Sequence, residues 1–353
     1  MRIFPLIPTL LLALPFLALP ARAQMAPTPD APPVSNAPAM AEEEEEPVTV
    51  LHAEVSLVDL FFSVRDKQGA LVPHLAQSDC KVSEDKQPQT LKSFTAESNL
   101  PLTLGLMVDT SGSQERVLEL EKDAGSQFLQ SILRSKDQAF VASFDSDVNL
   151  LQDMTNSPRQ LARGLSKAEV SIAGGGGATG VPGLGGGTVP VHGDPRGTVL
   201  YDAVVMVAEG KLNQESGRKA MILLTDGQDQ GSHAKLNEAI AAANRANIMV
   251  YVILLADVRG YLSQGFGYSG YSAMKKLTEE TGGRLIDVGN NGKKLAAAFS
   301  VIEEEMRSQY VVSYHSTNPK LDGGFRKIEV SCQPEDLKIQ VRKGYYAVAS
   351  DQQ

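Results

Sequence analysis

Three short segments of the sequence carry hydroxyl and carboxylate side chains at spacings that suit a metal ion. They are Asp109-Thr110-Ser111-Gly112-Ser113, Gly197-Thr198 and Thr225-Asp226-Gly227. Two carboxylates from separate segments, together with short hydroxyl side chains at alternate positions, supply the hard oxygen donors that suit Mg²⁺ or Mn²⁺. A site with so few carboxylates keeps water ligands and an open position for a ligand from outside.

The hydrophobic pattern predicts elements that place these segments together. Leu102 to Val108 is a continuous apolar run, typical of a strand covered on both faces. Val117, Leu120, Ala124, Phe128 and Ile132 recur at helical spacing. We predict strands at 102–108, 139–144, 220–224, 248–255 and 284–288, and helices at 117–132, 159–167, 201–212, 236–243, 273–281 and 295–306. This alternation indicates an α/β domain with a doubly wound, mostly parallel sheet, which binds ligands at the carboxyl ends of its strands.

Both flanks of this region show the alternation of β-strands instead. One flank runs from Val48 to Phe94, where we expect strands and no helix, with two short strands on either side of the turn Glu84–Gln87. The other flank begins after Gln309, with strands around 310–314, 328–330 and 339–345. The simplest assembly is one β-sandwich built from the N- and C-terminal segments, 48–98 and 310–349, with the α/β domain 99–309 inserted between them.

The N-terminus has the features of an export signal. Arg2, an apolar run and Ala21-Arg22-Ala23 predict a signal peptide over 1–23; a membrane anchor is the alternative. The stretch 24–47 is rich in Pro, Ala and Glu and predicts a linker, whose run Glu42–Glu46 is either a solvated tether or a site for cations or a basic partner. We therefore expect a periplasmic or secreted protein with no membrane span after cleavage.

The composition excludes two classes of binding protein. Of the 353 residues, 33 are Lys or Arg and 42 are Asp or Glu, and the net charge of −9 argues against a generic nucleic-acid binder. Five scattered histidines and two distant cysteines do not form a zinc cluster.

The three segments resemble a known family. Asp109, Ser111, Ser113, Thr198 and Asp226 occur in the order of the metal-ion-dependent adhesion site (MIDAS) of the von Willebrand factor A (VWFA) domain. The segments DLFFSVRDKQG, VSEDKQPQTLKSF, EEEMRSQYVVSYHS and RKGYYA resemble the exported VWFA-related proteins first grouped from acidobacteria. The resemblance implies that the hydroxyls ligate Mg²⁺ or Mn²⁺, that the two aspartates bind it directly or through water, and that the open position accepts a carboxylate of a partner protein.

Other features leave alternatives open. Cys80 and Cys332 lie one in each terminal β segment, so an exported chain either joins them in a disulfide or keeps two buried thiols. The glycine-rich stretch 173–196 lacks the Lys-Ser/Thr of a phosphate-binding loop. A second cation could bind at Asp145, Asp147 and Asp229–Ser232, or these side chains could be part of solvated surface loops.

Asp109, Ser111 and Ser113 could cap a helix in place of binding a metal ion. The loop aromatics could contact a partner protein or pack on the domain. These aromatics are Tyr261, Phe266, Tyr268 and Tyr271.

The function predicted from these residues is a non-enzymatic binding or adhesion module. Its cation would capture an acidic side chain of a partner protein. One alternative is a structural envelope protein that binds through its β-sandwich. Another is a metal-dependent hydrolase, against which the sequence shows no nucleophile and base constellation and no two-metal carboxylate cluster.

Overall fold

The computed structural model describes residues 57–96, 100–170, 197–256, 268–289 and 291–348. All of them belong to one unit of the chain, Ala53–Gln353. The predicted signal peptide 1–23 and linker 24–47 lie outside the described residues. Within the described ranges, no helix combines the length and apolar character needed to cross a bilayer.

A six-stranded sheet forms the centre of the α/β region, in the order β10-β9-β8-β5-β6-β7. Neighbouring strands are parallel except for β7, which runs antiparallel to β6 at the edge. The strands are β5 (Leu102–Asp109), β6 (Gln138–Phe144), β7 (Val148–Thr155), β8 (Arg218–Thr225), β9 (Ile248–Leu254) and β10 (Leu285–Asp287). The sequence analysis did not predict β7, because this half-buried edge strand lacks the continuous apolar run of the others.

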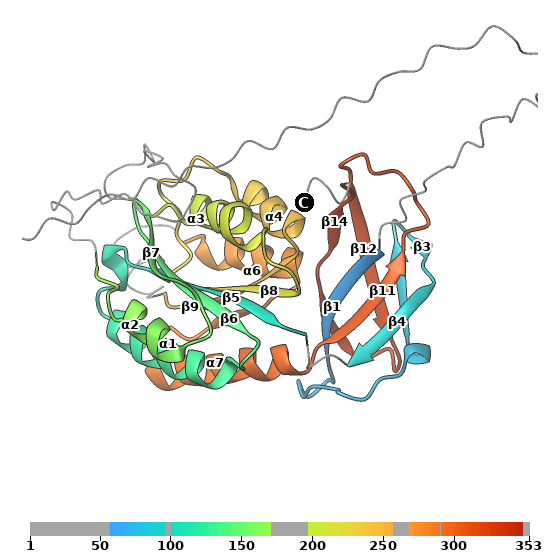
Figure 1. Ribbon diagram of the computed structural model, residues 1–353, viewed down its shortest axis with the longest axis horizontal. Helices are drawn as coiled ribbons and strands as arrows, with labels where there is room; N and C mark the ends of the chain where they lie inside the picture. The colour runs from blue at the N-terminus through green and yellow to red at the C-terminus, as the bar shows by residue number, and fades with distance from the viewer. Residues whose placement is uncertain (1–56, 97–99, 171–196, 257–267, 290, 349–353) are drawn as a thin grey trace, which may run out of the picture. The chain divides into compact units, whose positions relative to one another are not determined.

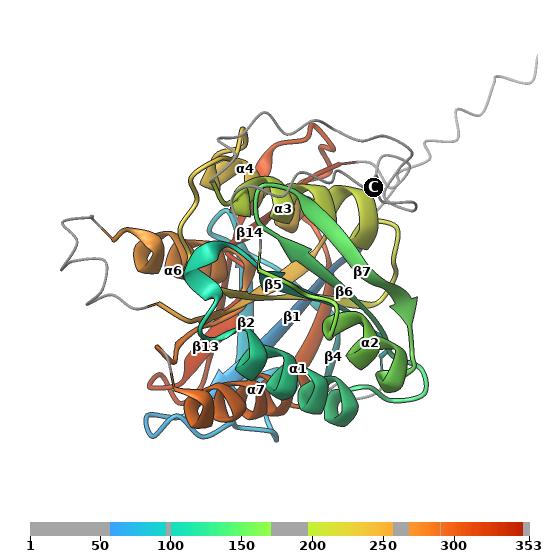
Figure 2. The same cartoon turned by 90° about the vertical axis from the view of Figure 1, so that its left-hand side faces the viewer.

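Helices cover both faces of this sheet, as the predicted α/β class requires (Figures 1 and 2). On one face lie α1 (Leu118–Ile132), α2 (Pro158–Leu165) and α7 (Gly292–Arg307). On the other lie α3 (Leu200–Val207), the wider turn η3 (Ala208–Leu212) that continues it, α4 (Leu236–Arg245) and α6 (Gly270–Thr281).

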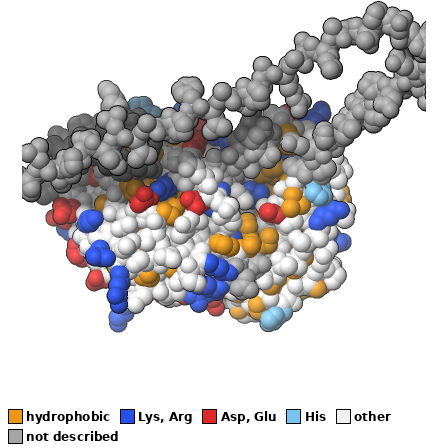
Figure 3. All heavy atoms as spheres, in the orientation of Figure 1, with side chains coloured by type: hydrophobic (Ala, Val, Ile, Leu, Met, Phe, Trp, Pro, Cys, Tyr) orange, Lys and Arg blue, Asp and Glu red, His pale blue; other side chains and the backbone are white. Residues whose placement is uncertain are grey.

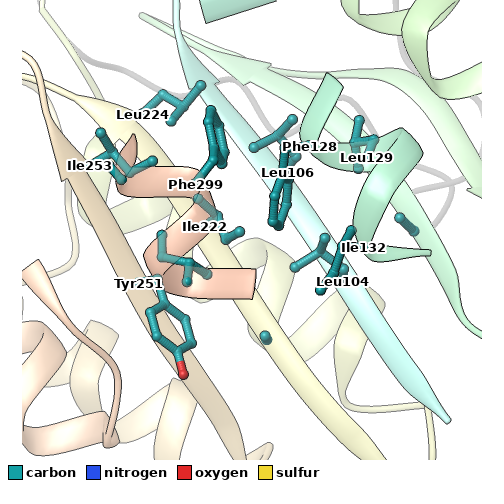
Figure 4. Close-up of a cluster of buried hydrophobic side chains, with 14 of the residues drawn as sticks. Leu104, Leu106, Phe128, Leu129, Ile132, Ile222, Leu224, Tyr251, Ile253 and Phe299 are labelled. Atoms are coloured by element: carbon teal, nitrogen blue, oxygen red, sulfur yellow. The ribbon is translucent and has the colours of Figure 1, made fainter. Parts of the chain in front are cut away.

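Apolar side chains form the core on the α1 and α7 side of the sheet (Figure 4). Side chains from four neighbouring strands meet Phe128 of α1 and Phe299 of α7, whose rings stack with centroids 4.7 Å apart. Each fully buried large apolar side chain contributes about 1.5–3 kcal/mol. This core holds α1 against the sheet directly after the first candidate metal-binding segment.

The buried face of α1 is the predicted one except at Leu120. Val117, Phe128 and Ile132 are buried as expected, but Leu120 is 43% exposed, whereas Glu121 is fully buried. The helix begins at Leu118, after the separate helical turn η2 (Gly112–Gln114), and its buried positions are 118, 121, 125, 128, 129 and 132. The apolar pattern missed positions 121 and 125 because Glu121 and Gly125 are not apolar side chains.

Two four-stranded antiparallel sheets form the β-sandwich, in the orders β13-β1-β11-β4 and β14-β12-β2-β3. The strands are β1 (Leu57–Arg65), β2 (Cys80–Glu84), β3 (Gln87–Pro88), β4 (Leu91–Ala96), β11 (Tyr310–His315), β12 (Phe325–Cys332), β13 (Lys338–Val341) and β14 (Gly344–Tyr346). Each sheet combines strands from both flanks, and the two share one core. The predicted fold class, an α/β domain inserted into a sandwich made by both ends, is therefore confirmed.

The two short strands expected on either side of the Glu84–Gln87 turn are present as β2 and β4. They belong to different sheets, because β2 pairs with the short β3 while β4 pairs with β11. The N-terminal flank also contains a helical turn, η1 (Gln77–Asp79), where none was expected.

A buried carboxylate links the sandwich to the α/β region. Glu305, near the end of α7, accepts hydrogen bonds from Arg65 of β1 at 3.0 Å and from Arg284 at 2.8 Å. The hydroxyl of Tyr251 donates to its other oxygen at 3.3 Å. Elsewhere, the visible surface of the described residues intersperses acidic and basic side chains (Figure 3).

Cys80 and Cys332 form a disulfide between β2 and β12, where they are register partners. The bond joins residues 252 positions apart and so connects the two flanks around the inserted domain.

We expect the double variant Cys80→Ser/Cys332→Ser to have a lower free energy of unfolding, by up to roughly 5 kcal/mol, because the unfolded chain is no longer closed into a long loop. Denaturant titration without reductant measures the difference. Reductant should lower the stability of the wild type and leave the variant unchanged. Equal stability of both proteins without reductant would contradict the prediction.

Candidate metal centre

The pairing of β5 with β8 brings two of the predicted segments to one edge of the sheet. The strands are parallel neighbours, with Val108 opposite Leu224. Asp109 is the last residue of β5, and Asp226 follows the last residue of β8. Both aspartates are buried, Asp109 completely and Asp226 with 2% exposure. The structure thus places the two carboxylates at the carboxyl end of the sheet, where the alternation of elements predicted a ligand site.

Hydrogen bonds fix both oxygens of the Asp109 carboxylate. The backbone N–H of Ser111 donates to Oδ1 at 3.0 Å, and the hydroxyl of Thr225 donates to Oδ2 at 2.6 Å. The hydroxyl oxygens of Ser111 and Ser113 lie 3.0 Å apart, with the side chain of Ser113 exposed. The two serine hydroxyls therefore form a pair on the solvent side of a fixed, buried carboxylate. Thr225 belongs to the third segment singled out in the sequence, but no role was predicted for its side chain.

Backbone bonds join the Thr198 segment to both neighbouring loops. The N–H of Val199 donates to the carbonyl of Asp145 at 2.7 Å, and the N–H of Gln230 donates to the carbonyl of Thr198 at 3.0 Å. Thr198 itself is 6% exposed. Residues 171–196, which include the glycine-rich stretch, lie outside the described residues.

Two features proposed as a second cation site have structural partners. Asp145 accepts a hydrogen bond from the Thr110 hydroxyl at 3.0 Å, which connects the ends of β5 and β6. Asp229 and Ser232 accept bonds from the N–H of Tyr201 at 3.2 and 3.0 Å, at the N-terminus of α3. Oxygen acceptors at this position satisfy N–H groups that a helix leaves unpaired. These side chains therefore hold the loops around Thr198 in place.

The chain turns sharply after Asp226, and the packing there leaves no room for a side chain at Gly227. Gly227 has φ +77°, and a Cβ there would lie 2.9 Å from Met274 and 3.1 Å from the carbonyl of Gly270. A larger residue at Gly227 would be strained in conformation and would collide with α6. The loop that carries Asp226 is thus held against the start of α6.

The loop aromatics divide between packing and exposure. The hydroxyl of Tyr268 donates to the carbonyl of Asp226 at 3.0 Å, so this ring supports the site from within the domain. Tyr271, in the first turn of α6, is 46% exposed. Tyr261 and Phe266 lie outside the described residues.

The surroundings of the site disfavour the ionised form of its carboxylates. Burial, followed by the nearby charge of Asp226, raises the pKa of Asp109 to about 7, against the hydrogen bonds from Ser111 and Thr225 that lower it. Burial and the charges of Asp109 and Asp226 also raise the pKa of Glu121 well above its usual range. A divalent cation among these groups would reverse the effect, because its charge stabilises the ionised carboxylates.

The donor set fits a hard divalent cation. Two carboxylates and three hydroxyls supply oxygen only, which is the preference of Mg²⁺ and Mn²⁺. In the parts of the chain that the structure describes, no three or more His, Cys, Asp or Glu side chains form a group that could hold a metal. The candidate centre is of another kind, since hydroxyl oxygens make up most of its donors.

No family model matches the chain, and neither does any curated protein. A von Willebrand factor type A structure from Catenulispora acidiphila is similar, with 11% identity over 84% of this chain and 75% of that one and a TM-score of 0.44. Proximal thread matrix protein 1 from the mussel byssus, with a zinc-occupied MIDAS motif, shows 15% identity over 63% of this chain and 49% of its own, with a TM-score of 0.45. BatB from Bacteroides thetaiotaomicron shows 15% identity over 57% of this chain and 99% of its own, with a TM-score of 0.39.

We expect the stability of the chelator-treated protein to fall as the pH rises from about 5 to about 8, relative to that of Asp109→Asn. The folded-state pKa of Asp109, about 7, exceeds the ordinary value of 3.8, so the folded protein holds this proton more tightly than the unfolded chain. The resulting contribution to stability is complete below the lower value and is lost as the pH passes the higher one. Urea titrations of both proteins at several pH values measure it, and parallel pH profiles would contradict it.

Proposed function

We propose that this chain is an exported VWFA-type binding protein that captures a carboxylate of a partner protein through a bound Mg²⁺ or Mn²⁺. The observation that carries the proposal is that Asp109 and Asp226 lie at the ends of two paired strands. Their carboxylates are buried, their charges repel each other, and hydroxyl donors lie beside them. Buried carboxylates of this kind require a compensating positive charge. The proposed organisation places the α/β domain at 99–309 and the sandwich segments at 48–98 and 310–349.

The chain's own residues would hold the cation in complementary ways. Ser111, Ser113 and Thr198 would offer hydroxyl oxygens, while Asp109 and Asp226 would bind directly or through water. The hydrogen bond from Thr225 orients the Asp109 carboxylate, as neighbouring groups do around metal ligands in general. The cation would supply an electrostatic bond to an incoming anion.

The charge balance favours an acidic ligand. The three hydroxyls add no charge, and an aspartate that binds through water neutralises the cation only in part, so the open coordination position remains attractive to another carboxylate. A direct bond of this kind is strong only where water is excluded around it. Tyr271 is exposed near the Asp226 loop, and aromatic side chains are enriched where protein partners exclude water. We therefore propose Tyr271 as a partner contact, together with Tyr261 and Phe266.

Export of the chain is part of the proposal. The predicted signal peptide leads to the periplasm or to secretion, and the Cys80–Cys332 disulfide supports an oxidising location, since such bonds are rare in the cytosol. The role that we propose is binding, and it needs neither a nucleophile nor a general base.

We expect the wild type to bind one Mn²⁺ or Mg²⁺ and Asp109→Ala to bind it at least about tenfold more weakly, because a buried ligand is lost. Calorimetric titration of chelator-stripped protein measures both affinities. Asp123→Ala, which removes an exposed carboxylate of α1, is the matched control and should bind as the wild type does. A wild type that binds neither ion would refute the metal site.

We expect the immobilised protein to retain a partner from an envelope extract only while a divalent cation is bound. Chelator should release the partner, added Mg²⁺ should restore it, and Asp226→Ala should not retain it. Carbodiimide amidation of the extract, which removes the partner's carboxylates, should also abolish retention. Tyr271→Ser should weaken retention without changing the affinity for Mn²⁺. Retention that persists in chelator would favour binding through the β-sandwich instead.

A further inference from the structure

Gln114 is a buried polar residue that contacts one of the predicted ligands without being one of them. It is the last residue of the helical turn η2, directly after Ser113, and its exposure is 0%. Its side-chain Nε2 lies 3.4 Å from the hydroxyl oxygen of Ser113, to which it donates a long hydrogen bond. The backbone N–H of Gln114 donates to the carbonyl of Ser111 at 2.9 Å, and its own carbonyl accepts from the N–H of Val117 at 3.0 Å. These backbone bonds hold Gln114 next to the serine pair.

The side-chain carbonyl of Gln114 has no hydrogen bond. Its Oε1 is buried and finds no partner among the described residues. Buried polar atoms are normally paired, and each exception needs an explanation. Packing alone would favour an apolar side chain of similar size, such as Met or Leu, which fills the space without leaving a polar atom unpaired.

A cation at the site would change what the Ser113 hydroxyl requires from its neighbour. A hydroxyl has one hydrogen and two lone pairs. An ion that takes one lone pair makes the hydroxyl a stronger donor, so an acceptor beside it is favoured over an N–H whose positive end faces the ion. The amide of Gln114 carries such an acceptor, and a half-turn about its terminal bond exchanges Nε2 with Oε1. This turn gives up only the long bond from Nε2, since Oε1 has no donor to lose.

We propose that Gln114 is a positioning residue of the cation site, whose side-chain carbonyl accepts a hydrogen bond from the Ser113 hydroxyl when the ion is bound. The inference rests on the proposed function, because it concerns the same ion. Gln114 acts through Ser113 and does not touch the ion itself. Because its amide is neutral, Gln114 supports ion binding without adding negative charge, and the open position stays attractive to a partner's carboxylate.

The test is a double-mutant cycle on Mn²⁺ binding by the full chain, with Gln114→Met, Ser113→Ala and the two combined. Methionine fills the space of glutamine and removes the amide. We expect Gln114→Met to bind Mn²⁺ about tenfold more weakly, the lower end of the range for groups that orient metal ligands. In the Ser113→Ala background, the same substitution should change the affinity by less than about twofold, because the hydroxyl through which Gln114 acts is gone.

Two further variants complete the test. Gln114→Glu keeps an acceptor oxygen and has no N–H, so it should bind Mn²⁺ at least as tightly as the wild type; weaker binding would contradict the acceptor role. Gln309→Met is the matched control, because Gln309 is also buried but bonds to Met249 and Arg218 at the opposite end of the sheet. This variant should bind Mn²⁺ as the wild type does.

The outcomes separate the inference from the proposed function. Mn²⁺ affinity of Gln114→Met within about twofold of the wild type, with Asp109→Ala impaired, would overturn the role of Gln114 and leave the metal site intact. An equal loss of affinity with and without the Ser113 hydroxyl would also overturn it. A wild type that binds no Mn²⁺ would overturn the proposed function itself. Gln114→Leu takes the place of the methionine variant if that variant does not fold.

Discussion

The repulsion between the buried carboxylates of Asp109 and Asp226 is the constraint on which the candidate site depends. Parallel pairing of β5 and β8 brings these groups to one edge, and the apolar helices around the sheet remove them from water. Hydrogen bonds from Ser111 and Thr225 offset only part of the cost. A divalent cation of the kind we propose would offset the remainder, because its charge stabilises the ionised form of both carboxylates.

The remainder of the structure keeps this edge in place. Backbone bonds tie the Thr198 segment to the loops after β6 and β8, and the Asp226 loop rests on α6 where only glycine fits at 227. The sandwich is linked to the α/β region by Arg65, which bonds to Glu305 near the end of α7. Positions of the ligand side chains are thus set by the scaffold, which is the condition for a precise metal site.

Much of the fold could be predicted from the sequence, because continuous apolar runs and helical spacing indicate which residues are buried. The order of the five candidate ligands and their places at strand ends predicted the site, and the structure brings the ends of β5 and β8 together as neighbours. The five-residue site and its metal binding stay predictions. The sequence could not reveal that Glu121 is buried while Leu120 is exposed, since a glutamate in an amphipathic helix is ordinarily assigned to the solvated face. It also could not assign β2 and β4 to different sheets, because strand pairing depends on partners more than 200 residues away.

The nested order of the chain has a consequence for how the protein is made. β1 and β2 are synthesised early, but β11 and β12, which pair with them, come last. The α/β domain can form from contacts within its own segment. The edges of the early strands stay unpaired until the inserted domain and the strands after it have been synthesised. For an exported chain this interval falls during and just after translocation. Aggregation and dependence on folding helpers should therefore concentrate in the first strands and not in the inserted α/β domain.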